Sequence, residues 1–244
     1  MQRCLVALGG NVGRVDETFA AALAQFDAAA GVRVLRSSSV HCSLPVGRQA
    51  GGAFRNAAAE IETDLPPLDL LDRLQAIESR FGRTRDVHWG PRTLDLDLIL
   101  YGSEIIDLPR LRVPHPACWY RRFVLDPIVE IAPDAVHPEK GATFSRLRDR
   151  LLPRPLRVGV AGGNPESRSF LIRAVREEFA DVACGEWRPG DPEPALLAWL
   201  APDDSAPAFE LLPFLPRLDA SRALPDPGAF FRDVIQSAGG SRSA

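Results

Sequence analysis

Lysine is almost absent from this chain of 244 residues. Lys140 is its only lysine, and every other one of the 29 basic residues is an arginine. The simplest cause is the base composition of the genome, but the bias still constrains chemistry. No lysine is available as a Schiff base or a phosphate clamp, so phosphate binding has to use arginine, helix N-termini or a metal ion.

Paired cysteines and long apolar runs are also missing. The four cysteines, Cys4, Cys42, Cys118 and Cys184, are scattered without a C-x-x-C, which excludes a zinc or redox motif of that kind. No apolar run approaches the roughly 20 residues that span a bilayer. The opening residues, "MQRCLVALGGNVG", do not resemble a signal peptide. We therefore expect reduced thiols, no membrane association and a cytoplasmic location.

The remaining composition is that of an ordinary soluble protein. The apolar fraction is 45%, the charged fraction is 25% and the formal net charge is −3. The length allows one large domain or a medium domain with a small one.

The first part of the chain alternates strand and helix patterns. We predict strands over 2–8, 32–43, 54–63 and 92–102, with helices over 16–31 and from Pro66-Pro67 to Gly82. This β-α-β-β-α-β order predicts an α+β fold of the ferredoxin-like type. A loop and a short helix, rich in arginine and aromatics, should follow.

Two prolines, Pro153 and Pro155, suggest a boundary between a domain over 1–152 and a small α/β module over 156–244. In the second segment we expect strands over 156–163, 195–202 and 214–221, and helices over 166–182 and 226–240.

The stretch "HWGPRTLDLDLILYG", residues 88–102, holds the clearest chemical pattern. Side chains alternate along a strand, so Asp95 and Asp97 should share one face, with Leu94, Leu96, Leu98 and Leu100 on the other. Two carboxylates this close repel unless a positive charge lies near them. Magnesium, which takes one or two carboxylates together with substrate phosphates, would supply it. The alternative is a strand face with solvated aspartates.

Arginines cluster on both sides of this strand. They are suited to phosphate oxygens, so carboxylates and arginines together indicate phosphoryl transfer. A solvated surface in an arginine-biased proteome explains some of them, but explains their clustering less well. The arginines are Arg83, Arg85, Arg92, Arg110, Arg112, Arg121 and Arg122.

At these residues the chain resembles the 6-hydroxymethyl-7,8-dihydropterin pyrophosphokinases of folate biosynthesis. "HWGPRTLDLDLI" is similar to the long family signature x-G-P-R-x-x-D-L-D. "VALGGNVG", "NAAAEIET", "RLRVPHP" and "RRFVLDPIVEIAP" resemble further family segments, so the resemblance covers roughly residues 2–150. It implies a ferredoxin-like fold and transfer of diphosphate from ATP to the hydroxymethyl group of the pterin, with release of AMP.

The resemblance also implies roles for individual residues. Asp95 and Asp97 would hold two Mg²⁺ ions against the ATP phosphates, and Arg83 and Arg92 would contact those phosphates during transfer. The implied nucleotide contacts and closing-loop residues are Glu78, Arg85, Trp89, Arg110, Arg112, His115 and Arg121.

For the flat pterin, the resemblance implies aromatic stacking and an amide that reads the ring edge. The implied residues are Phe54 and Phe123 for stacking, Asn56 for the edge, and Ser43, Leu44, Pro45 and Val46 as a wall beside the ring. Core packing is the alternative for each phenylalanine taken singly, and a structural role is the alternative for His115.

The start of the second segment, "VGVAGGNPESRSFLIRAV", resembles a P-loop kinase. Gly162, Ser167, Arg168 and Ser169 take the motif positions, so the motif lysine and its second glycine are missing. The tail resembles the end of deoxynucleoside-kinase-like domains. Two interpretations stay open: a degenerate P-loop-like module with a structural or interaction role, or an unrelated small domain. We predict no site there, only a contact with a second copy or with another pathway enzyme.

Two further functions compete with the pyrophosphokinase. A ferredoxin-like sheet with many arginines is compatible with RNA binding. The acidic balance and the two aspartates on the candidate face argue against any nucleic acid. An inactive scaffold is disfavoured because Asp95, Asp97, Arg92, Asn56 and both stacking positions occur together.

Overall fold

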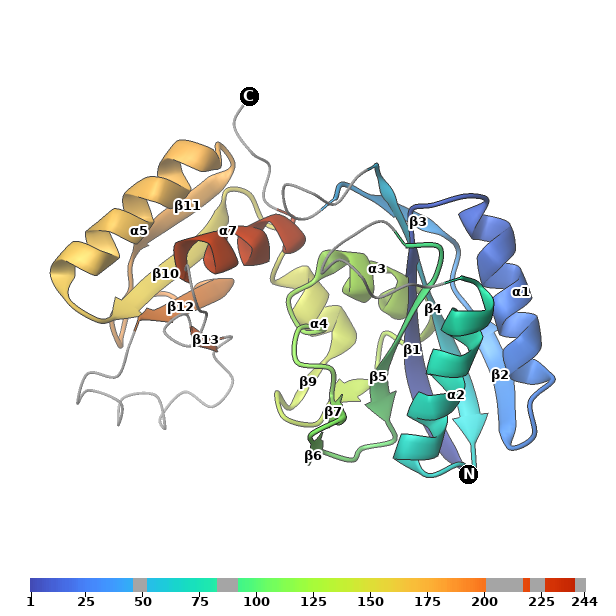
Figure 1. Ribbon diagram of the computed structural model, residues 1–244. Helices are drawn as coiled ribbons and strands as arrows, with labels where there is room; N and C mark the ends of the chain where they lie inside the picture. The colour runs from blue at the N-terminus through green and yellow to red at the C-terminus, as the bar shows by residue number, and fades with distance from the viewer. Residues whose placement is uncertain (46–51, 83–91, 201–216, 220–226, 240–244) are drawn as a thin grey trace. The chain divides into compact units, whose positions relative to one another are not determined.

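The computed structural model describes residues 1–45, 52–82, 92–200, 217–219 and 227–239. The chain forms two compact units. The first contains residues 1–119 and 123–146, and the second contains residues 120–122 and 147–244. Together the units combine helices with sheets in a mixed α/β structure (Figure 1).

The first unit is built around an antiparallel sheet in the order β2-β4-β1-β5, with β3 also pairing with β4. Its elements are β1 (Gln2–Gly10), α1 (Val15–Asp27), β2 (Val32–Ser37), β3 (His41–Ser43), β4 (Phe54–Thr63), α2 (Pro67–Arg80) and β5 (Asp95–Tyr101). The predicted sequence of strands and helices in this part is confirmed, apart from the division of one strand.

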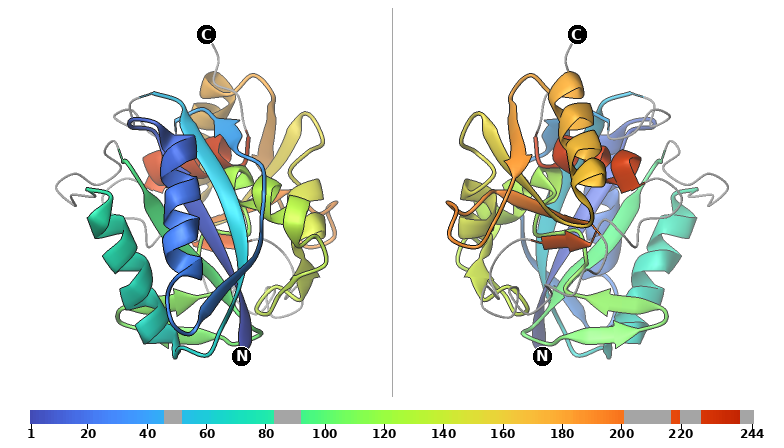
Figure 2. Two further views of the ribbon diagram at one scale, coloured as in Figure 1. Left: turned by 90° about the vertical axis from the view of Figure 1, so that its right-hand side faces the viewer. Right: turned by 90° about the vertical axis from the view of Figure 1, so that its left-hand side faces the viewer.

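Helices α1 and α2 cover one face of this sheet (Figure 2). The buried side chains of α1 include Phe19 and Phe26, and those of α2 include Leu70 and Leu74. They pack with alternate residues of the strands, which is the burial expected for amphipathic helices on a sheet. The residues that alternate with these along the strands point to the other face of the sheet, and they include Asp95 and Asp97.

The predicted strand over 32–43 is wrong as a single element, because the structure divides it into β2 and β3. The predicted leucine face is also wrong at one position. The pairing of β5 with β1 shifts by one residue near Ile99, so the core cluster continues from Leu98 to Tyr101 instead of Leu100. A β-bulge of this kind reverses the alternation of side chains.

The segment after β5 holds more regular structure than the loop and short helix that the sequence predicted. It contains the hairpin β6 (Ile106–Leu108) and β7 (Leu111–Val113), α3 (Arg122–Ile131), the short pair β8 (Val136–His137) and β9 (Ala142–Thr143), and α4 (Phe144–Asp149). Strands of two or three residues are too short for a period-two pattern to reveal them.

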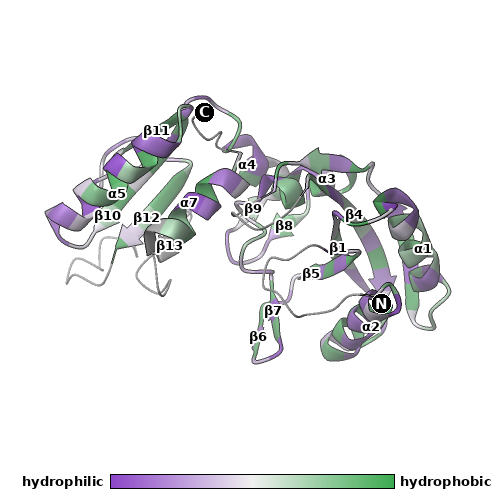
Figure 3. Ribbon diagram, turned by 45° about the horizontal axis from the view of Figure 1, so that its top comes forward, coloured by the Kyte–Doolittle hydropathy of each residue, from purple (hydrophilic) through white to green (hydrophobic). Residues whose placement is uncertain are grey.

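The second unit contains a parallel sheet in the order β11-β10-β12-β13. Its elements are β10 (Leu156–Gly162), α5 (Pro165–Glu178), β11 (Val182–Glu186), β12 (Leu196–Leu200), β13 (Arg217–Asp219) and α7 (Pro227–Ser237). The central strands β10 and β12 are hydrophobic along most of their length (Figure 3), as buried parallel strands usually are. The predicted helix over 166–182 was too long, because it ends at Glu178 and β11 begins at Val182.

The second unit begins earlier than the two prolines suggest. Arg150 bonds to Glu193 at 3.0 Å, and Arg154 bonds to Asp181 at 3.1 Å. These contacts tie the residues around Pro153 and Pro155 to the second unit. The division into domains 1–152 and 156–244 stays a prediction.

A glycine pair makes the turn between β10 and α5. Gly162 and Gly163 have φ values of +70° and +58°, which suit glycine. A Cβ on Gly162 would lie 2.8 Å from the carbonyl oxygen of Leu200. The close approach of β12 therefore explains why glycine is needed at these two positions, and no bound ligand has to be invoked.

The residues that follow this turn bind to each other. Asn164 caps α5 by accepting a hydrogen bond at 2.7 Å from the backbone N–H of Ser167. Arg168 donates to the carbonyl oxygens of Gly162 and Gly163 at 3.0 and 2.7 Å. The guanidinium at the predicted P-loop lysine position thus bonds to the turn itself.

All four cysteines are free, in agreement with the predicted reduced thiols. Burial raises the pKa of Cys4 and of Cys184 to about 12, so both thiols stay protonated and unreactive near neutral pH. In the part of the chain that the structure describes, no helix has the length and apolar character needed to cross a membrane.

His137 is a buried titratable group whose pKa in the unfolded chain lies just below neutral pH. It is 1% exposed, packs near Phe144, and its Nδ1 accepts a hydrogen bond from the backbone N–H of Lys140 at 3.3 Å. Burial, aided by the charge of Lys140, lowers the pKa of His137 from 6.5 to about 4. The unfolded chain therefore binds more protons between these values, so stability is full above pH 6.5 and falls as the pH drops toward 4.

We expect the free energy of unfolding of the wild type to fall by about 1 kcal/mol through His137 between pH 7.5 and pH 5.5. The substitution His137→Asn keeps an acceptor near the Lys140 N–H but removes the titration. Urea unfolding at both pH values should show a smaller pH effect in this variant. An equal pH effect in the two proteins would contradict the assignment.

Candidate active site

The two aspartates lie on the sheet face opposite α1 and α2. In the sheet register, Asp95 pairs with Gly9 of β1, and Gly9 pairs with Asn56 of β4. Paired residues of neighbouring strands point to the same side of a sheet. Asn56, Gly9 and Asp95 therefore form one row across three strands, and Asp97 belongs to the next row of the same face.

Gly9 leaves the middle of this row without a side chain. A Cβ there would lie 3.7 Å from Cβ of Asp95 and 3.8 Å from Oδ1 of Asn56. Neighbouring strands are about 4.8 Å apart, so the backbones of Asn56 and Asp95 are separated by about 10 Å. The row thus has an amide at one end, a carboxylate at the other and no side chain between them.

Arg92 accompanies the aspartates. Its guanidinium forms an ion pair with Asp95, and the two side chains are 24% and 15% exposed. This pair supplies part of the positive charge that two neighbouring carboxylates require.

Asn11 holds the backbone of Arg92 and was missed as a functional residue. Its Oδ1 accepts from the Arg92 N–H at 2.8 Å, and its own N–H donates to the Arg92 carbonyl at 2.9 Å. The sequence gives no local signal for it, because the pairing of the preceding strand with the aspartate strand appears only in the structure. The residue type alone does not show that the side-chain amide of Asn11 holds the backbone of Arg92.

Glu78 supports the aspartate strand from the helix side. It is 2% exposed, and its Oε1 accepts a hydrogen bond from the backbone N–H of Leu96 at 2.7 Å. Because β5 is the edge strand of the sheet, this amide faces away from β1. Glu78 therefore satisfies a backbone group between Asp95 and Asp97.

Three of the residues predicted to bind a pterin, Asn56, Ser43 and Phe54, lie together at the other end of the row. Asn56 is 5% exposed, and its Nδ2 donates to Oγ of Ser43 at 2.9 Å. Phe54 pairs with Ser43 in the register of β3 and β4 and is half-buried. The half-buried Phe123 lies in the first turn of α3. Leu44 is 79% exposed and Pro45 is half-buried.

The residues predicted to contact nucleotide are less concentrated. Arg110 forms an exposed ion pair with Asp72. Arg112 bonds to Asp107 at 2.7 and 3.2 Å, and this pairing lowers the pKa of Asp107.

His115 is half-buried, and its Nδ1 accepts from the Ala117 N–H at 3.2 Å, which assigns the proton to Nε2. Arg121 falls in the second unit. The remaining predicted residues lie outside the described part of the chain: Val46, Arg83, Arg85 and Trp89.

The carboxylate pair is suited to magnesium. Within residues 1–45, 52–82, 92–200 and the short described stretches beyond, no group of three or more His, Cys, Asp or Glu side chains is placed to hold a metal ion. Magnesium commonly takes only one or two protein carboxylates, with phosphate oxygens and water as its other ligands. Asp95 and Asp97 fit that requirement.

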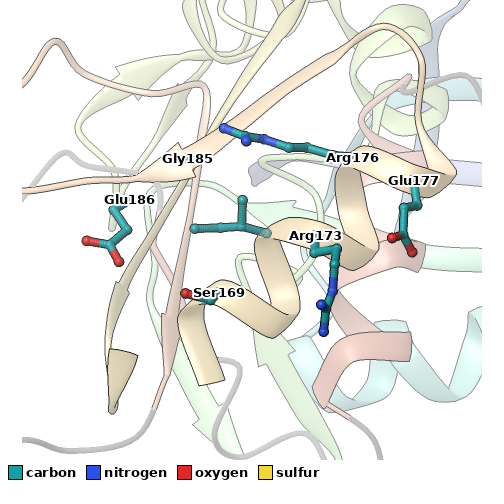
Figure 4. A pocket seen from close by; sticks show the side chains of 7 residues that line it. Ser169, Arg173, Arg176, Glu177, Gly185 and Glu186 are labelled. Carbon is teal, nitrogen blue, oxygen red and sulfur yellow. The ribbon is translucent and has the colours of Figure 1, made fainter. Parts of the chain in front are cut away.

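The second unit contains a pocket of about 490 Å³ between α5 and β11 (Figure 4). Arg176 extends from α5 along its wall toward Gly185, and its Nε donates to the carbonyl of Cys184 at 2.8 Å. Glu177 and Glu186 add negative charge to the lining. The sequence predicted no site in this segment, and the mixed charges do not select a ligand.

The pattern of one protein family covers more than half of the chain. The family of 7,8-dihydro-6-hydroxymethylpterin-pyrophosphokinase (HPPK) matches residues 5–133. This chain belongs to the HPPK family. The match includes the strands of the main sheet, both covering helices, the aspartate strand and α3.

Curated members of the family are close in sequence. The 2-amino-4-hydroxy-6-hydroxymethyldihydropteridine pyrophosphokinase of Pseudomonas aeruginosa is 47% identical over 139 residues, which are 57% of this chain and 86% of that protein. The enzyme of the same name from Synechocystis is 43% identical over 153 residues, or 62% of this chain and 78% of that protein. That of Bacillus subtilis is 44% identical over 138 residues, 57% of this chain and 81% of that protein.

Solved structures are similar at the level of fold. A crystal structure of Plasmodium falciparum HPPK-DHPS, a triple mutant with SDX-DHP, aligns with a TM-score of 0.50 and 12% identity. The alignment covers 87% of this chain and 59% of that one.

We expect Glu78→Ala to lower the free energy of unfolding by about 2 kcal/mol, because it removes a buried acceptor and leaves the Leu96 N–H without it. Urea unfolding measures the loss. The control Asp72→Ala removes an exposed carboxylate from the same helix and should cost below about 1 kcal/mol. Equal losses in the two variants would show that Glu78 does not brace β5.

Proposed function

We propose that this chain transfers the diphosphate of ATP to the hydroxymethyl oxygen of 6-hydroxymethyl-7,8-dihydropterin, with Asp95 and Asp97 as the metal-binding residues. As a member of the HPPK family it is a pyrophosphokinase of folate biosynthesis. The row of Asn56, Gly9 and Asp95 is the observation that carries the detailed proposal. The row would join an amide that reads the ring edge to a carboxylate that holds the metal and its phosphates, both on one sheet face.

The reaction is one displacement at phosphorus. The hydroxymethyl oxygen of the pterin forms a bond to the β-phosphorus of ATP and loses its proton. The bond from that phosphorus to the oxygen bridging to the α-phosphate breaks, and AMP leaves. Little covalent chemistry falls to the protein, so rate depends on alignment and on neutralising phosphate charge.

The carboxylates would hold two Mg²⁺ ions. When bound, these ions supply positive charge to the phosphates and orient them. Asp95 and Asp97 project from one strand, which is braced by Glu78 on one side and by β1 on the other. A strand held this way keeps the two carboxylates at a constant spacing.

Arg92 would contribute to phosphate binding together with Arg83, with Arg85 and Trp89 in the same loop. Arg92 lies next to Asp95 and its backbone is held by Asn11. Its guanidinium can exchange the carboxylate for phosphate oxygens, to which it donates equally well. Exclusion of water by this loop would keep the pterin as the acceptor.

The pterin ring would stack between Phe54 and Phe123, with Asn56 reading its edge. The bond from Asn56 to Ser43 orients the amide. Ser43, Leu44, Pro45 and Val46 would form the wall beside the ring. The high exposure of Leu44 is suited to covering a face of the flat pterin ring.

The nucleotide would be bound by Arg110, Arg112, His115 and Arg121. The carboxylate partners of Arg110 and Arg112 are exposed, so exchanging them for phosphate costs little. Glu78 would act through β5, since its Oε1 is already bonded to Leu96.

We also propose that the first domain, 1–152, has the ferredoxin-like arrangement. Support comes from the antiparallel strand order β2-β4-β1-β5 and from the position of both helices on one face. The second domain, 156–244, is proposed as a module with a structural or interaction role, in contact with a second copy or a pathway enzyme. The bonding of Arg168 to its own turn favours such a role over nucleotide binding. The cytoplasmic location stays a prediction.

Purified protein with ATP, Mg²⁺ and hydroxymethyl-dihydropterin should release AMP with time. Omission of either the pterin or Mg²⁺ should stop the release. Release of AMP at the same rate with and without the pterin would contradict the proposal. Salt-dependent binding of RNA without turnover would support the nucleic-acid alternative instead.

We expect Asp97→Ala to abolish turnover, with a loss of at least about a thousandfold, because one metal-binding carboxylate is removed. Asp97 is half-buried and lies outside the core cluster that packs against α1 and α2, so circular dichroism and urea unfolding should remain near those of the wild type. The control Asp16→Ala, which removes an exposed carboxylate on α1, should keep full activity. Near-normal rates in Asp97→Ala with saturating Mg²⁺ would contradict the two-carboxylate mechanism.

We expect a shortened chain that ends at Leu152 to keep the AMP-releasing activity of the full chain. The family match ends at residue 133, and the proposed site residues all precede Leu152. Steady-state rates at equal protein concentration measure this. A chain that precipitates or loses activity would show that the second segment is integral to the enzyme.

A further inference from the structure

The chain makes a bulge where β2 passes into β3. Ser37 pairs with Ala59 of β4, but His41 pairs with Asn56. Residues 38–40 therefore lie opposite only residues 57 and 58, so one strand carries an extra residue. Ser38 keeps its bonds to Ala58, with its N–H donating to the carbonyl and its Oγ accepting from the N–H, both at 2.9 Å.

Glu130 of α3 binds Ser39 of this bulge and His41 at the start of β3. Its Oε1 accepts from the Ser39 N–H at 2.8 Å, and its Oε2 accepts from the Ser39 hydroxyl at 2.7 Å. The same Oε2 lies 2.9 Å from Nε2 of His41. One carboxylate thus joins a helix to a strand that is far away in sequence, through three short contacts.

The carboxylate is held in its charged form. The Ser39 N–H first, and then His41 and the Ser39 hydroxyl, lower the pKa of Glu130 below its ordinary value. Hydrogen bonds to an ionised acceptor are stronger than those between neutral groups. The imidazole contributes as a donor from Nε2.

Both ends of this contact lead to the proposed pterin site. Glu130 follows Phe123 by seven residues, or about two helical turns, so the two side chains lie on the same side of α3. His41 precedes Ser43 by two residues and therefore shares its face of β3. Ser43 in turn accepts the bond from Asn56.

We infer that Glu130 is a positioning residue of the pterin site. By binding Ser39 and His41, it sets the distance between α3, which carries the stacking residue Phe123, and the strand pair that carries Ser43 and Asn56. The inference rests on the proposed function. Glu130 bonds to Ser39 and His41, which are not among the proposed ring contacts, so it would act on the ring through the spacing of its two walls.

A positioning role for Glu130 predicts different effects on the binding of the pterin and on the binding of ATP. A ring that stacks between two walls loses affinity when their spacing is loosened, whereas the aspartate strand β5 has its own supports in Glu78 and β1. A merely structural contact would instead lower stability and affect both substrates alike.

The test is steady-state kinetics of the full chain with Glu130→Ala. We expect the KM for hydroxymethyl-dihydropterin to rise about tenfold or more while the KM for ATP stays within about twofold. The control Glu17→Ala removes an exposed carboxylate, paired with Arg14 on α1, and should change neither value. His41→Ala and Ser39→Ala each remove one contact and should raise the pterin KM by a smaller factor. These two variants decide the question if Glu130→Ala does not fold.

Unchanged pterin KM values in Glu130→Ala, or in both single-contact variants, would overturn the inference. So would an equal rise in both KM values. In either case AMP release by the wild type would still support the proposed function. Absence of pterin-dependent AMP release by the wild type would instead refute the proposed function itself.

Discussion

The candidate site depends on the register of a single edge strand. Because β5 pairs with β1 so that Asp95 lies opposite Gly9, its two carboxylates reach the face that carries Asn56. A slip of one residue would turn both aspartates into the core beneath α1 and α2. The leucines that alternate with them, the braced amide of Leu96 and the backbone contacts of Arg92 with Asn11 all act to prevent such a slip.

Much of the first unit was predictable because its signals are local. The alternation of Leu94, Asp95, Leu96 and Asp97 indicates a strand with one polar face, and Leu70, Leu74 and Ile77 indicate a helix with one apolar face. Asp95, Asp97 and Arg92 are also neighbours in sequence. The placement of Asn56 on the same sheet face was implied only by resemblance to a family, since no local pattern reports which strand pairs with which.

The features that sequence reasoning missed are breaks in these patterns. The extra residue in the segment 38–40 divides one predicted strand into two. The shift near Ile99 places Tyr101 instead of Leu100 in the core cluster under α1 and α2. The bulge and the register shift both depend on which residue of a neighbouring strand, distant in sequence, pairs with each position. The role of Asn11 is likewise tertiary, because an amide that binds the backbone of residue 92 looks like any polar residue in a turn.

Gly9 lies on the strand between Asn56 and Asp95, so the sheet itself fixes the distance between these two residues. The distance between neighbouring strands of a sheet is nearly constant. The distance from the backbone of Asn56 to that of Asp95 is therefore fixed at two strand spacings, and small backbone shifts cannot change it. A compound that tethers a flat heterocycle to a chain of phosphates would therefore have to match that two-strand interval. Shorter or longer tethers would leave one end of the molecule out of reach of its anchor.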